Sequence, residues 1–274
     1  MEGHVTVWGV VNVTPDSFSD GGRHADTASA LTHARALRRA GAEVLDIGGE
    51  STRPGAAPVP LDVEVDRVVP LVRALRDQGD DGLVSVDTRH PVVARAALAA
   101  GADIVNDVGG GRDPALLEVV AERGAGLVLM HMQGEPRTMQ AAPTYGDVVS
   151  EVIAFLVAQA QAARALGIRR VWLDPGLGFG KTTRHNLQLL AGLERLVAEG
   201  PVLLGASRKR FLGELTDEPQ ADRRLAGSLA AAARGFEAGV DAVRVHDVRE
   251  TRQLLDVLEA IRRHAGIGDG RAIG

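Results

Sequence analysis

Polar residues recur along this sequence directly after short apolar runs. The run from Val171 to Leu173 leads into Asp174, and a Pro-Gly pair and a glycine-spaced loop follow. This order is typical of a buried parallel strand that delivers a carboxylate to a ligand-facing loop. Other apolar runs end in the same way, at Asn12, Asp46, Asp87, Asn106, His131, Ser207, Arg244 and His246. Because the carboxyl ends of parallel strands lie on one rim, we expect these side chains to surround a single site.

Three of these strand ends and one lysine have the donor and acceptor types that a flat heterocycle requires. Asp87, Asn106 and Asp174 end three expected strands, and Lys209 lies just beyond another. A carboxylate accepts two parallel hydrogen bonds from an amino group and the adjacent ring N–H, whereas a carbonyl or ring nitrogen needs Asn or Lys as donor. Each aspartate alone is explained as well by helix capping or by pairing with a lysine. Together they favour a heterocycle pocket.

A second group is cationic and favours an anion. In the run AVRVHDV, Arg244 alternates with two valines and precedes His246, so Arg244 points into a barrel mouth if the valines pack outward. Asn12 is expected opposite, and Arg53 lies in the second long loop. A guanidinium binds phosphate oxygens in pairs, and helix N-termini on the rim add backbone donors. Single Arg and His residues are usually solvated, but the apolar strand around this pair indicates an anion site.

The glycine-rich segment GLGFGKTT, residues 176–183, does not match a nucleotide-binding loop. A P-loop needs four residues between its first glycine and the Gly-Lys pair, and here only three follow Gly176. The segments TPDSFSDGG (14–22) and ESTRPGAAP (50–58) are long and rich in Pro, Gly and Ser. Exposed turns would account for both, but Phe18 at the tip of the first segment favours a lid that closes over a substrate.

Eight strand–helix units of roughly thirty residues must position these side chains, which fits a single-domain (β/α)8 TIM barrel better than an open sheet. Strands are expected at 5–11, 44–49 and 83–86, and near residues 104, 127, 171, 202 and 242. Helices are expected at 27–40 with Asp26 as N-cap, 61–78, from Pro91, and at 115–123, 147–166, 183–197, 222–238 and 248–265. Glycines stand at the expected helix-to-strand joints: Gly41, Gly101, Gly124, Gly167 and Gly239. We expect one domain at 1–265 and a loose tail at 266–274.

Composition bounds the possible partners and the compartment. With 274 residues, 45% of them hydrophobic, the chain can bury a large core. Its net charge of −5 gives no overall basic field for nucleic acid or anionic membrane. The apolar stretches look too short to span a bilayer, and the N-terminus enters a strand pattern without a signal peptide. The absence of cysteine excludes disulfides and thiolate sites and suits the cytoplasm.

The motifs, in their order along the whole chain, resemble those of the dihydropteroate synthases, pterin-binding enzymes of folate biosynthesis. They are VVNVTPDSFSDGG, VLDIGGESTRPGA, VSVDT, IVNDV, LVLMHM, LDPGLGFGK, GASRKRF and VRVHD. The resemblance implies a (β/α)8 fold, usually a homodimer. It implies a transferase that joins p-aminobenzoate to hydroxymethyl-dihydropterin pyrophosphate and releases pyrophosphate with Mg²⁺.

Carried over by motif, the resemblance also implies roles for individual residues. Pterin binding falls to Asp87, Asn106, Met130, Asp174, Phe179 and Lys209. The p-aminobenzoate side falls to Phe18, Thr52, Arg53, Pro54 and Ser207. The pyrophosphate end falls to Asn12, Asp46, Arg244 and His246, with Asn12 as metal ligand. The catalytic set is Asn12, Asp20, Lys209, Arg244 and His246. We expect no protein nucleophile: the cationic end neutralises the leaving pyrophosphate while the aromatic amine attacks.

Rival interpretations make different demands on the same residues. An aldolase-type barrel would use Lys209 as a Schiff base, and a pterin-binding methyltransferase barrel would share the Asp and Asn strand ends but would not need the STRPG and SRK loops. A non-catalytic pterin-binding paralogue would keep the pocket without turnover. In the helix at 222–238, Gly227, Ser228 and the alanine run suit a dimer contact or packing against the barrel equally well. Arg210 and residues 132–146 receive no role from the motifs.

Overall fold

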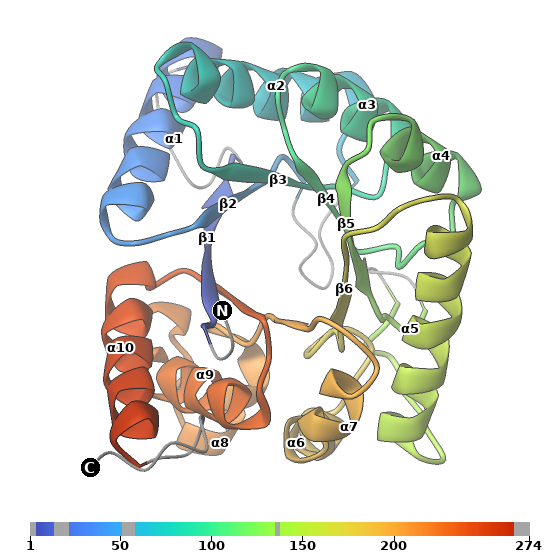
Figure 1. Ribbon diagram of the computed structural model, residues 1–274, viewed down its shortest axis with the longest axis vertical. Coiled ribbons are helices and arrows are strands. Elements are labelled where there is room, and N and C mark those ends of the chain that lie inside the picture. The colour runs from blue at the N-terminus through green and yellow to red at the C-terminus, as the bar shows by residue number, and fades with distance from the viewer. Residues whose placement is uncertain (1–3, 14–21, 51–57, 135–137, 266–274) are drawn as a thin grey trace.

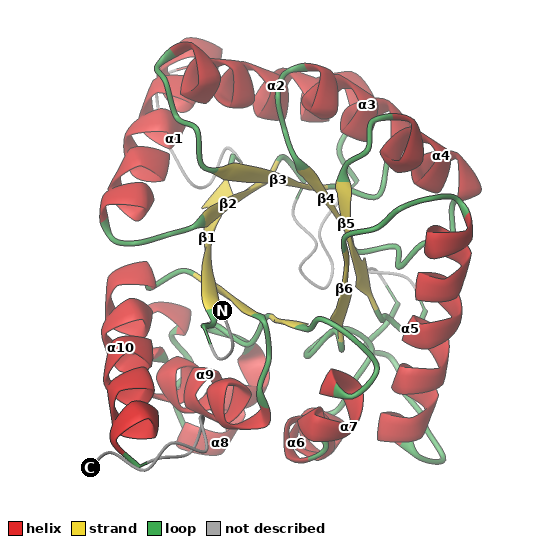
Figure 2. Ribbon diagram, in the orientation of Figure 1, coloured by secondary structure: helices red, strands yellow, loops and turns green. Residues whose placement is uncertain are grey.

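The computed structural model describes residues 4–13, 22–50, 58–134 and 138–265, and in these ranges eight parallel strands form a barrel ringed by helices (Figures 1 and 2). The strands are β1 (Thr6–Asn12), β2 (Val44–Gly48), β3 (Leu83–Asp87), β4 (Ile104–Asp107), β5 (Gly126–Met130), β6 (Val171–Asp174), β7 (Leu203–Leu204) and β8 (Ala242–Val245). Their order is β6-β5-β4-β3-β2-β1-β8-β7, and a bridge between Leu173 and Val202 joins the two edges. The expected (β/α)8 barrel is confirmed.

The helices follow the strands along the chain and cover the outside of the barrel. They are α1 (Gly22–Arg39), α2 (Leu61–Asp77), α3 (Pro91–Ala99), α4 (Pro114–Glu122), α5 (Val148–Ala165), α6 (Thr183–Ala191), α7 (Leu193–Val197), α8 (Arg210–Thr216), α9 (Leu225–Ala238) and α10 (Val248–His264), with a 3-10 helix at Ala221–Arg223. Asp113 and Asp147 cap α4 and α5 through side-chain hydrogen bonds to backbone N–H groups, and Pro91 begins α3 as expected.

Three helix predictions were wrong in detail. Helix α1 begins at Gly22, so Asp26 lies inside it and is not its N-cap, because the backbone stays helical through the four residues before Asp26. The helix predicted at 183–197 is divided at Gly192, a residue type that disfavours helix interiors. The helix predicted at 222–238 is a 3-10 turn followed by α9, and α8 was not predicted. The five joint glycines all have positive φ, as their positions predict.

The interior of the barrel is filled by an apolar layer. Trp8 and Trp172 meet edge to face at 5.4 Å, and the other members of the layer are Val44, Ile104, Val128, Leu203 and Ala242. Side chains alternate along a strand, so the residues two positions further along also point inward. Those positions hold Asp46, Asn106, Met130, Asp174 and Arg244. The apolar layer is therefore the floor of a polar chamber at the carboxyl ends of the strands.

A larger apolar layer fills the space between the strands and the helices. It buries, for example, Leu45 of β2, Leu71 of α2 and Leu156 of α5, and each such side chain contributes about 1.5–3 kcal/mol on burial. Among the described helices, α5 is long and apolar enough to cross a membrane by length and composition. The expectation that every apolar stretch is too short was wrong in that respect. In the fold, α5 packs against β5 and β6 with Val152, Leu156 and Ala163 buried.

Candidate active site

Arg244 lies at the centre of the polar chamber and joins two strand-end carboxylates. Its Nε donates to Asp46 Oδ2 at 2.5 Å, and its Nη2 donates to Asp87 Oδ2 at 2.8 Å. Asn106 Nδ2 also donates to Asp46 Oδ2, at 3.2 Å. Burial opposes the charge of Arg244, but the carboxylates of Asp46 and Asp87 outweigh it and raise the pKa of the guanidinium. Strands β2, β3, β4 and β8 are thus linked across the chamber.

The same network leaves buried acceptor oxygens without partners. Among the described residues, Asp46 Oδ1, Asp87 Oδ1 and Asn106 Oδ1 are buried and accept no hydrogen bond. Burial raises the pKa of Asp87 to about 7, although Arg244 opposes the rise. An unpaired buried acceptor costs about 1–3 kcal/mol. A ligand that presents several N–H donors would remove this cost.

Asp174 and Lys209 form the opposite wall of the chamber. A methyl group built on Gly205 would lie 3.7 Å from both Asp174 Oδ2 and Lys209 Nζ, so the two side chains flank the same bare stretch of backbone. Asp174 Oδ1 accepts from the Gly176 N–H at 2.7 Å, and Lys209 Nζ donates to the Leu177 carbonyl at 2.5 Å. Burial raises the pKa of Asp174 and lowers that of Lys209 to about 8, and each opposes the other's shift.

An apolar cluster at the mouth provides a surface on which a ring can lie. Met130 packs with Val108, Met132 and Met139, and Phe179 contacts the cluster. The Phe179 ring centre lies 4.8 Å from Lys209 Nζ, which is within cation–π range. The predicted pterin residues Asp87, Asn106, Met130, Asp174, Phe179 and Lys209 therefore come together around one chamber.

Ser207 and His246 contact each other at the mouth of the chamber. Ser207 Oγ lies 3.1 Å from His246 Nδ1 and also accepts from the His246 N–H at 3.1 Å. The Ser207-to-Lys209 turn is fixed by Arg208, which has a φ of +60° and binds Asp247 through Nε and Nη2 at 3.0 and 2.5 Å. This contact joins the turn after β7 to the first residue beyond His246. Ser207, which was predicted on the p-aminobenzoate side, therefore lies against His246 of the predicted pyrophosphate end.

The glycine loop after β6 rests on a buried pair formed by His131, which the sequence predicts as a strand end of the site, and Lys181, which it did not predict. Lys181 Nζ lies 3.0 Å from His131 Nδ1 and donates to the His131 and Phe179 carbonyls. Burial lowers the pKa of Lys181 to about 7 and that of His131 to about 3. The signal was present, because His131 was recognised as a strand end and Lys181 follows the GLGFG run.

Residues after β5 cover this loop from outside. Gln140 Nε2 donates to the Gly178 carbonyl at 2.5 Å, and Tyr145 donates to the Gly180 carbonyl at 2.8 Å. The described part of the 132–146 stretch therefore supports the loop that carries Phe179. Arg210, also without a predicted role, extends into solvent and pairs with Glu214 on α8 at 2.8 Å.

The remaining predicted residues fall into two groups. Asn12 ends β1 beside Gly48 of β2 and is half-buried at the rim, whereas Asp46 lies fully buried beneath Arg244 and holds it. Asp46 is therefore a support for Arg244 within the predicted pyrophosphate end. The other five residues, Phe18, Asp20, Thr52, Arg53 and Pro54, lie outside the described residues, as does the predicted tail at 266–274.

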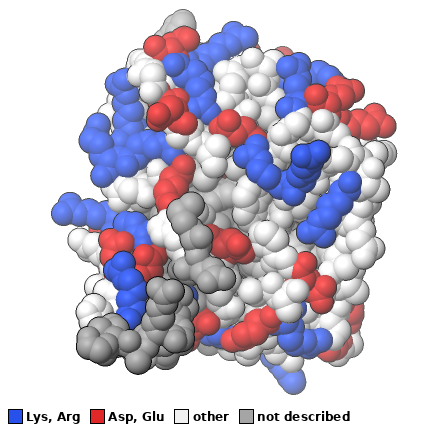
Figure 3. All heavy atoms as spheres, in the orientation of Figure 1, with Lys and Arg blue, Asp and Glu red and all other residues white. Residues whose placement is uncertain are grey.

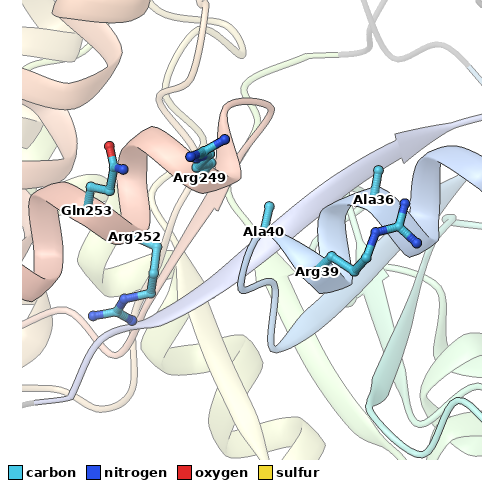
Figure 4. Close-up of a pocket in the computed structure, with 6 residues that line it drawn as sticks. All are labelled: Ala36, Arg39, Ala40, Arg249, Arg252 and Gln253. Atoms are coloured by element: carbon cyan, nitrogen blue, oxygen red, sulfur yellow. The ribbon is translucent and has the colours of Figure 1, made fainter.

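Other surfaces offer less chemistry. A groove between α1 and α10 is lined by Ala36, Arg39, Ala40, Arg249, Arg252 and Gln253, and its arginine side chains diverge (Figure 4). Its lining holds no acid and no histidine. On the face shown in Figure 3, basic and acidic side chains are interspersed. The chamber at the strand ends therefore remains the candidate active site.

Comparison with known proteins identifies one family over nearly the whole chain. The family "Pterin binding enzyme" matches residues 8–246. Dihydropteroate synthase of Mycobacterium leprae is 49% identical, with 96% of this chain and 95% of the relative covered. The Escherichia coli K12 dihydropteroate synthase is 45% identical, with 94% and 92% covered.

Solved structures agree. The Xanthomonas albilineans dihydropteroate synthase with 4-aminobenzoic acid has a TM-score of 0.88 and 49% identity, with 94% of this chain and 93% of that chain covered. The same organism's enzyme in complex with 7,8-dihydropteroate has a TM-score of 0.85 and 46% identity, with 94% of each chain covered. Given this match and the polar chamber at the strand ends, the chain belongs to the pterin-binding enzyme family.

Proposed function

We propose that this chain is a dihydropteroate synthase, a transferase that condenses p-aminobenzoate with (7,8-dihydropterin-6-yl)methyl diphosphate to give 7,8-dihydropteroate and diphosphate. The observation that carries the proposal is the set of unpartnered buried acceptors on Asp46, Asp87 and Asn106 beside Asp174 and Lys209. A pterin presents an amino group and ring N–H groups to such acceptors, and its carbonyl and ring nitrogens to the lysine. The relatives named above carry the same activity in their names.

Recognition of the ring orients the reacting carbon. The pterin lies on the cluster of Met130 and Phe179, with its donors toward Asp87 and Asp174 and its methylene carbon toward the mouth. Lys209 donates to the ring and lies against Phe179. Fixing both substrates in one geometry supplies about 7–11 kcal/mol of the barrier in well-oriented systems. The chamber therefore acts first by orientation.

The chemical step needs no covalent enzyme intermediate. The C–O bond between the methylene carbon and the diphosphate breaks, and its electron pair leaves with the diphosphate. The amine nitrogen of p-aminobenzoate forms the new C–N bond and then releases its proton to water. Lys209 stays a hydrogen-bond donor throughout, which separates this reaction from that of a Schiff-base barrel.

Arg244 and His246 stabilise the departing diphosphate. Nε and Nη2 of Arg244 bind Asp46 and Asp87, and among the described residues its Nη1 donates to no side chain, so this nitrogen remains for an incoming anion. Because the carboxylates already fix the guanidinium plane, little reorganisation is needed as charge develops on the leaving group. Ser207 holds the imidazole of His246 by its contact with Nδ1.

Mg²⁺ fits the same end through Asn12. The side chain of Asn12 stands half-buried on the rim, with no hydrogen bond among the described residues. An amide oxygen is a hard ligand of the kind that Mg²⁺ prefers, so Asn12 would hold the ion beside the diphosphate. When bound, the ion neutralises charge on the diphosphate. Asn12→Ala should therefore raise the Mg²⁺ concentration that half-saturates turnover.

We also propose a cytoplasmic homodimer. Exposed apolar side chains such as Leu187 on α6, Leu215 on α8 and Val257 on α10 support a subunit contact. Ser228 does not, because its hydroxyl accepts from the Arg208 N–H inside the fold. The absence of cysteine supports a reducing compartment. Light scattering on the purified protein tests the dimer: a monomeric mass at micromolar concentration would contradict it.

The direct test of the proposed function is diphosphate release by the purified protein. The protein receives the pterin diphosphate with and without p-aminobenzoate, and with Mg²⁺ or with EDTA. We expect release only with p-aminobenzoate and Mg²⁺ present, and 7,8-dihydropteroate as product. Pterin binding without turnover under these conditions would contradict the synthase and favour a methyltransferase or a non-catalytic paralogue.

A further inference from the structure

Three potential metal ligands meet behind the chamber, where β2 and β3 lead into their helices. Glu50 follows β2, Glu64 lies in the first turn of α2, and His90 is the residue before α3. His90 Nε2 lies 3.7 Å from Glu50 Oε2 and 3.9 Å from Glu64 Oε2, and the three ligand atoms all lie within 4.8 Å of one another. Three separate segments of the chain therefore converge on one point.

Glu64 is the unexpected member of this cluster. Its side chain is 0% exposed, and neither carboxylate oxygen meets hydrogen-bond geometry with a described residue, although the Thr88 hydroxyl lies close to the carboxylate. Burial raises the pKa of Glu64 to about 7, and the nearby Thr88 hydroxyl moderates the rise. A buried carboxylate without hydrogen bonds is costly unless a cation compensates it. Glu64 Oε2 nevertheless faces His90 Nε2 at 3.9 Å, an arrangement that a cation bound between the two groups would explain.

The charged side chains around the cluster do not fill the position between Glu50, Glu64 and His90. Arg67 lies near Glu64 but donates to the Gly49 carbonyl at 2.7 Å. Arg89 Nε lies 3.9 Å from Glu50 Oε2, and its side chain is 36% exposed, so it can turn toward solvent. Asp113 adds a further negative charge near His90.

We propose that Glu50, Glu64 and His90 bind a divalent transition-metal ion of the Zn²⁺ class, through one oxygen of each carboxylate and Nε2 of the histidine. Ligand bonds of about 2.0–2.2 Å in tetrahedral geometry separate neighbouring ligand atoms by about 3.4 Å. The separations of 3.7 and 3.9 Å need only a small contraction to reach that value. An imidazole with two carboxylates selects Zn²⁺ or a similar ion over Mg²⁺, which prefers oxygen ligands alone.

This site is separate from the Mg²⁺ that the proposed reaction uses, and it does not depend on the proposed function. One oxygen of Glu50 already accepts from the Val59 N–H at 3.0 Å, so the carboxylate can hold the chain with one oxygen and the metal with the other. The ion would link the ends of β2 and β3 to the start of α2. Its role is therefore structural.

The experiment is equilibrium dialysis of the full chain against micromolar ZnCl₂, without diphosphate or pterin. The variants are Glu64→Gln and His90→Gln, with His33→Ala, an exposed histidine on α1, as the control for adventitious binding. We expect one equivalent bound by the wild type and by the control. Either ligand variant should bind more weakly by at least the 10- to 100-fold that loss of an outer-shell partner costs.

Two further measurements keep the outcome clear. Zn²⁺ should raise the unfolding temperature of the wild type and not that of Glu64→Gln, whose unfolding temperature without metal should equal or exceed that of the wild type. Co²⁺ in place of Zn²⁺ should give the visible bands of a four- or five-coordinate ion. The proposal would be overturned if the wild type bound no Zn²⁺, or if both ligand variants bound Zn²⁺ as tightly as the wild type does.

Discussion

Replacing Arg244 by alanine tests whether the chamber depends on its buried ion pairs. The guanidinium is 20% exposed and bridges Asp46, which is 0% exposed, and Asp87, which is 11% exposed. Removing one partner of a buried pair leaves an uncompensated charge and costs about 3–5 kcal/mol. We therefore expect Arg244→Ala to lower the free energy of unfolding by that amount near pH 8, in addition to lowering turnover.

The pH dependence of this loss has a definite sign. Burial raises the folded-state pKa of Asp87 from 3.8 to about 7, so the folded protein binds this proton more tightly than the unfolded chain, and stability falls as pH rises toward 7. Without Arg244 the pKa of Asp87 rises further, because Arg244 lowers it. The fall in stability then continues to higher pH. The gap between the wild type and the variant should widen as pH increases above about 7.

Urea unfolding at several pH values measures these differences. The matched control is Arg95→Ala, since Arg95 binds Glu122 at 2.8 Å with both side chains about half exposed, and such a pair is worth about 0–1 kcal/mol. The double variant Arg244→Ala with Asp87→Asn should recover part of the loss by removing the stranded carboxylate. Equal losses for Arg244→Ala and Arg95→Ala would refute the buried ion-pair reasoning.

Three further predictions follow from the chamber. Lys209→Gln should weaken pterin binding and remove the alkaline limb of the kcat/KM profile. The reason is that burial lowers the pKa of Lys209 to about 8, so that its ammonium is lost above that pH. An adduct trapped by borohydride would instead show a covalent role for Lys209. The affinity of the wild type for pterin should rise with pH through about 7 as Asp87 ionises, and the affinity of Asp87→Asn should not change with pH. If fluorescence titration found the same dependence of affinity on pH in both proteins, Asp87 would not be the group that binds the pterin donors. Urea unfolding should show a larger loss of stability for Gly176→Ala than for Gly124→Ala. Both glycines have φ near +60°, but only at Gly176 would an added methyl group collide with the His131 carbonyl. Equal losses would contradict the close approach of the Gly176 backbone to that carbonyl.

The sequence predicts the rim of this site well because strand alternation is a local rule. An inward-pointing position stays inward two residues later, so Asp46, Asn106, Asp174 and Arg244 could be assigned to the chamber from their spacing. Their pairing could not. Arg244 and Asp46 are 198 residues apart, and they meet only because β8 closes against β1. The support that Asp46 gives to Arg244 is a property of the closed barrel.

Other features depend on burial that local sequence does not reveal. Glu64 lies where an acidic residue ordinarily favours a helix N-terminus from the surface, yet here its side chain is fully buried. Arg208 adopts a positive φ that its residue type does not predict, because the bonds to Asp247 hold the turn. The division at Gly192 was signalled by the glycine itself. Tertiary packing decided which of these signals prevailed.

The measurement that tests the central claim most directly is the affinity of the wild-type protein for two ligands that differ at one group. One is 6-hydroxymethyl-7,8-dihydropterin, and the other is the corresponding lumazine, in which an oxygen replaces the 2-amino group. If the buried carboxylates recognise ring donors, the lumazine should bind at least about 100-fold more weakly, because an acceptor then faces an acceptor. Equal binding of the two ligands would contradict the assignment of the chamber as a pterin site.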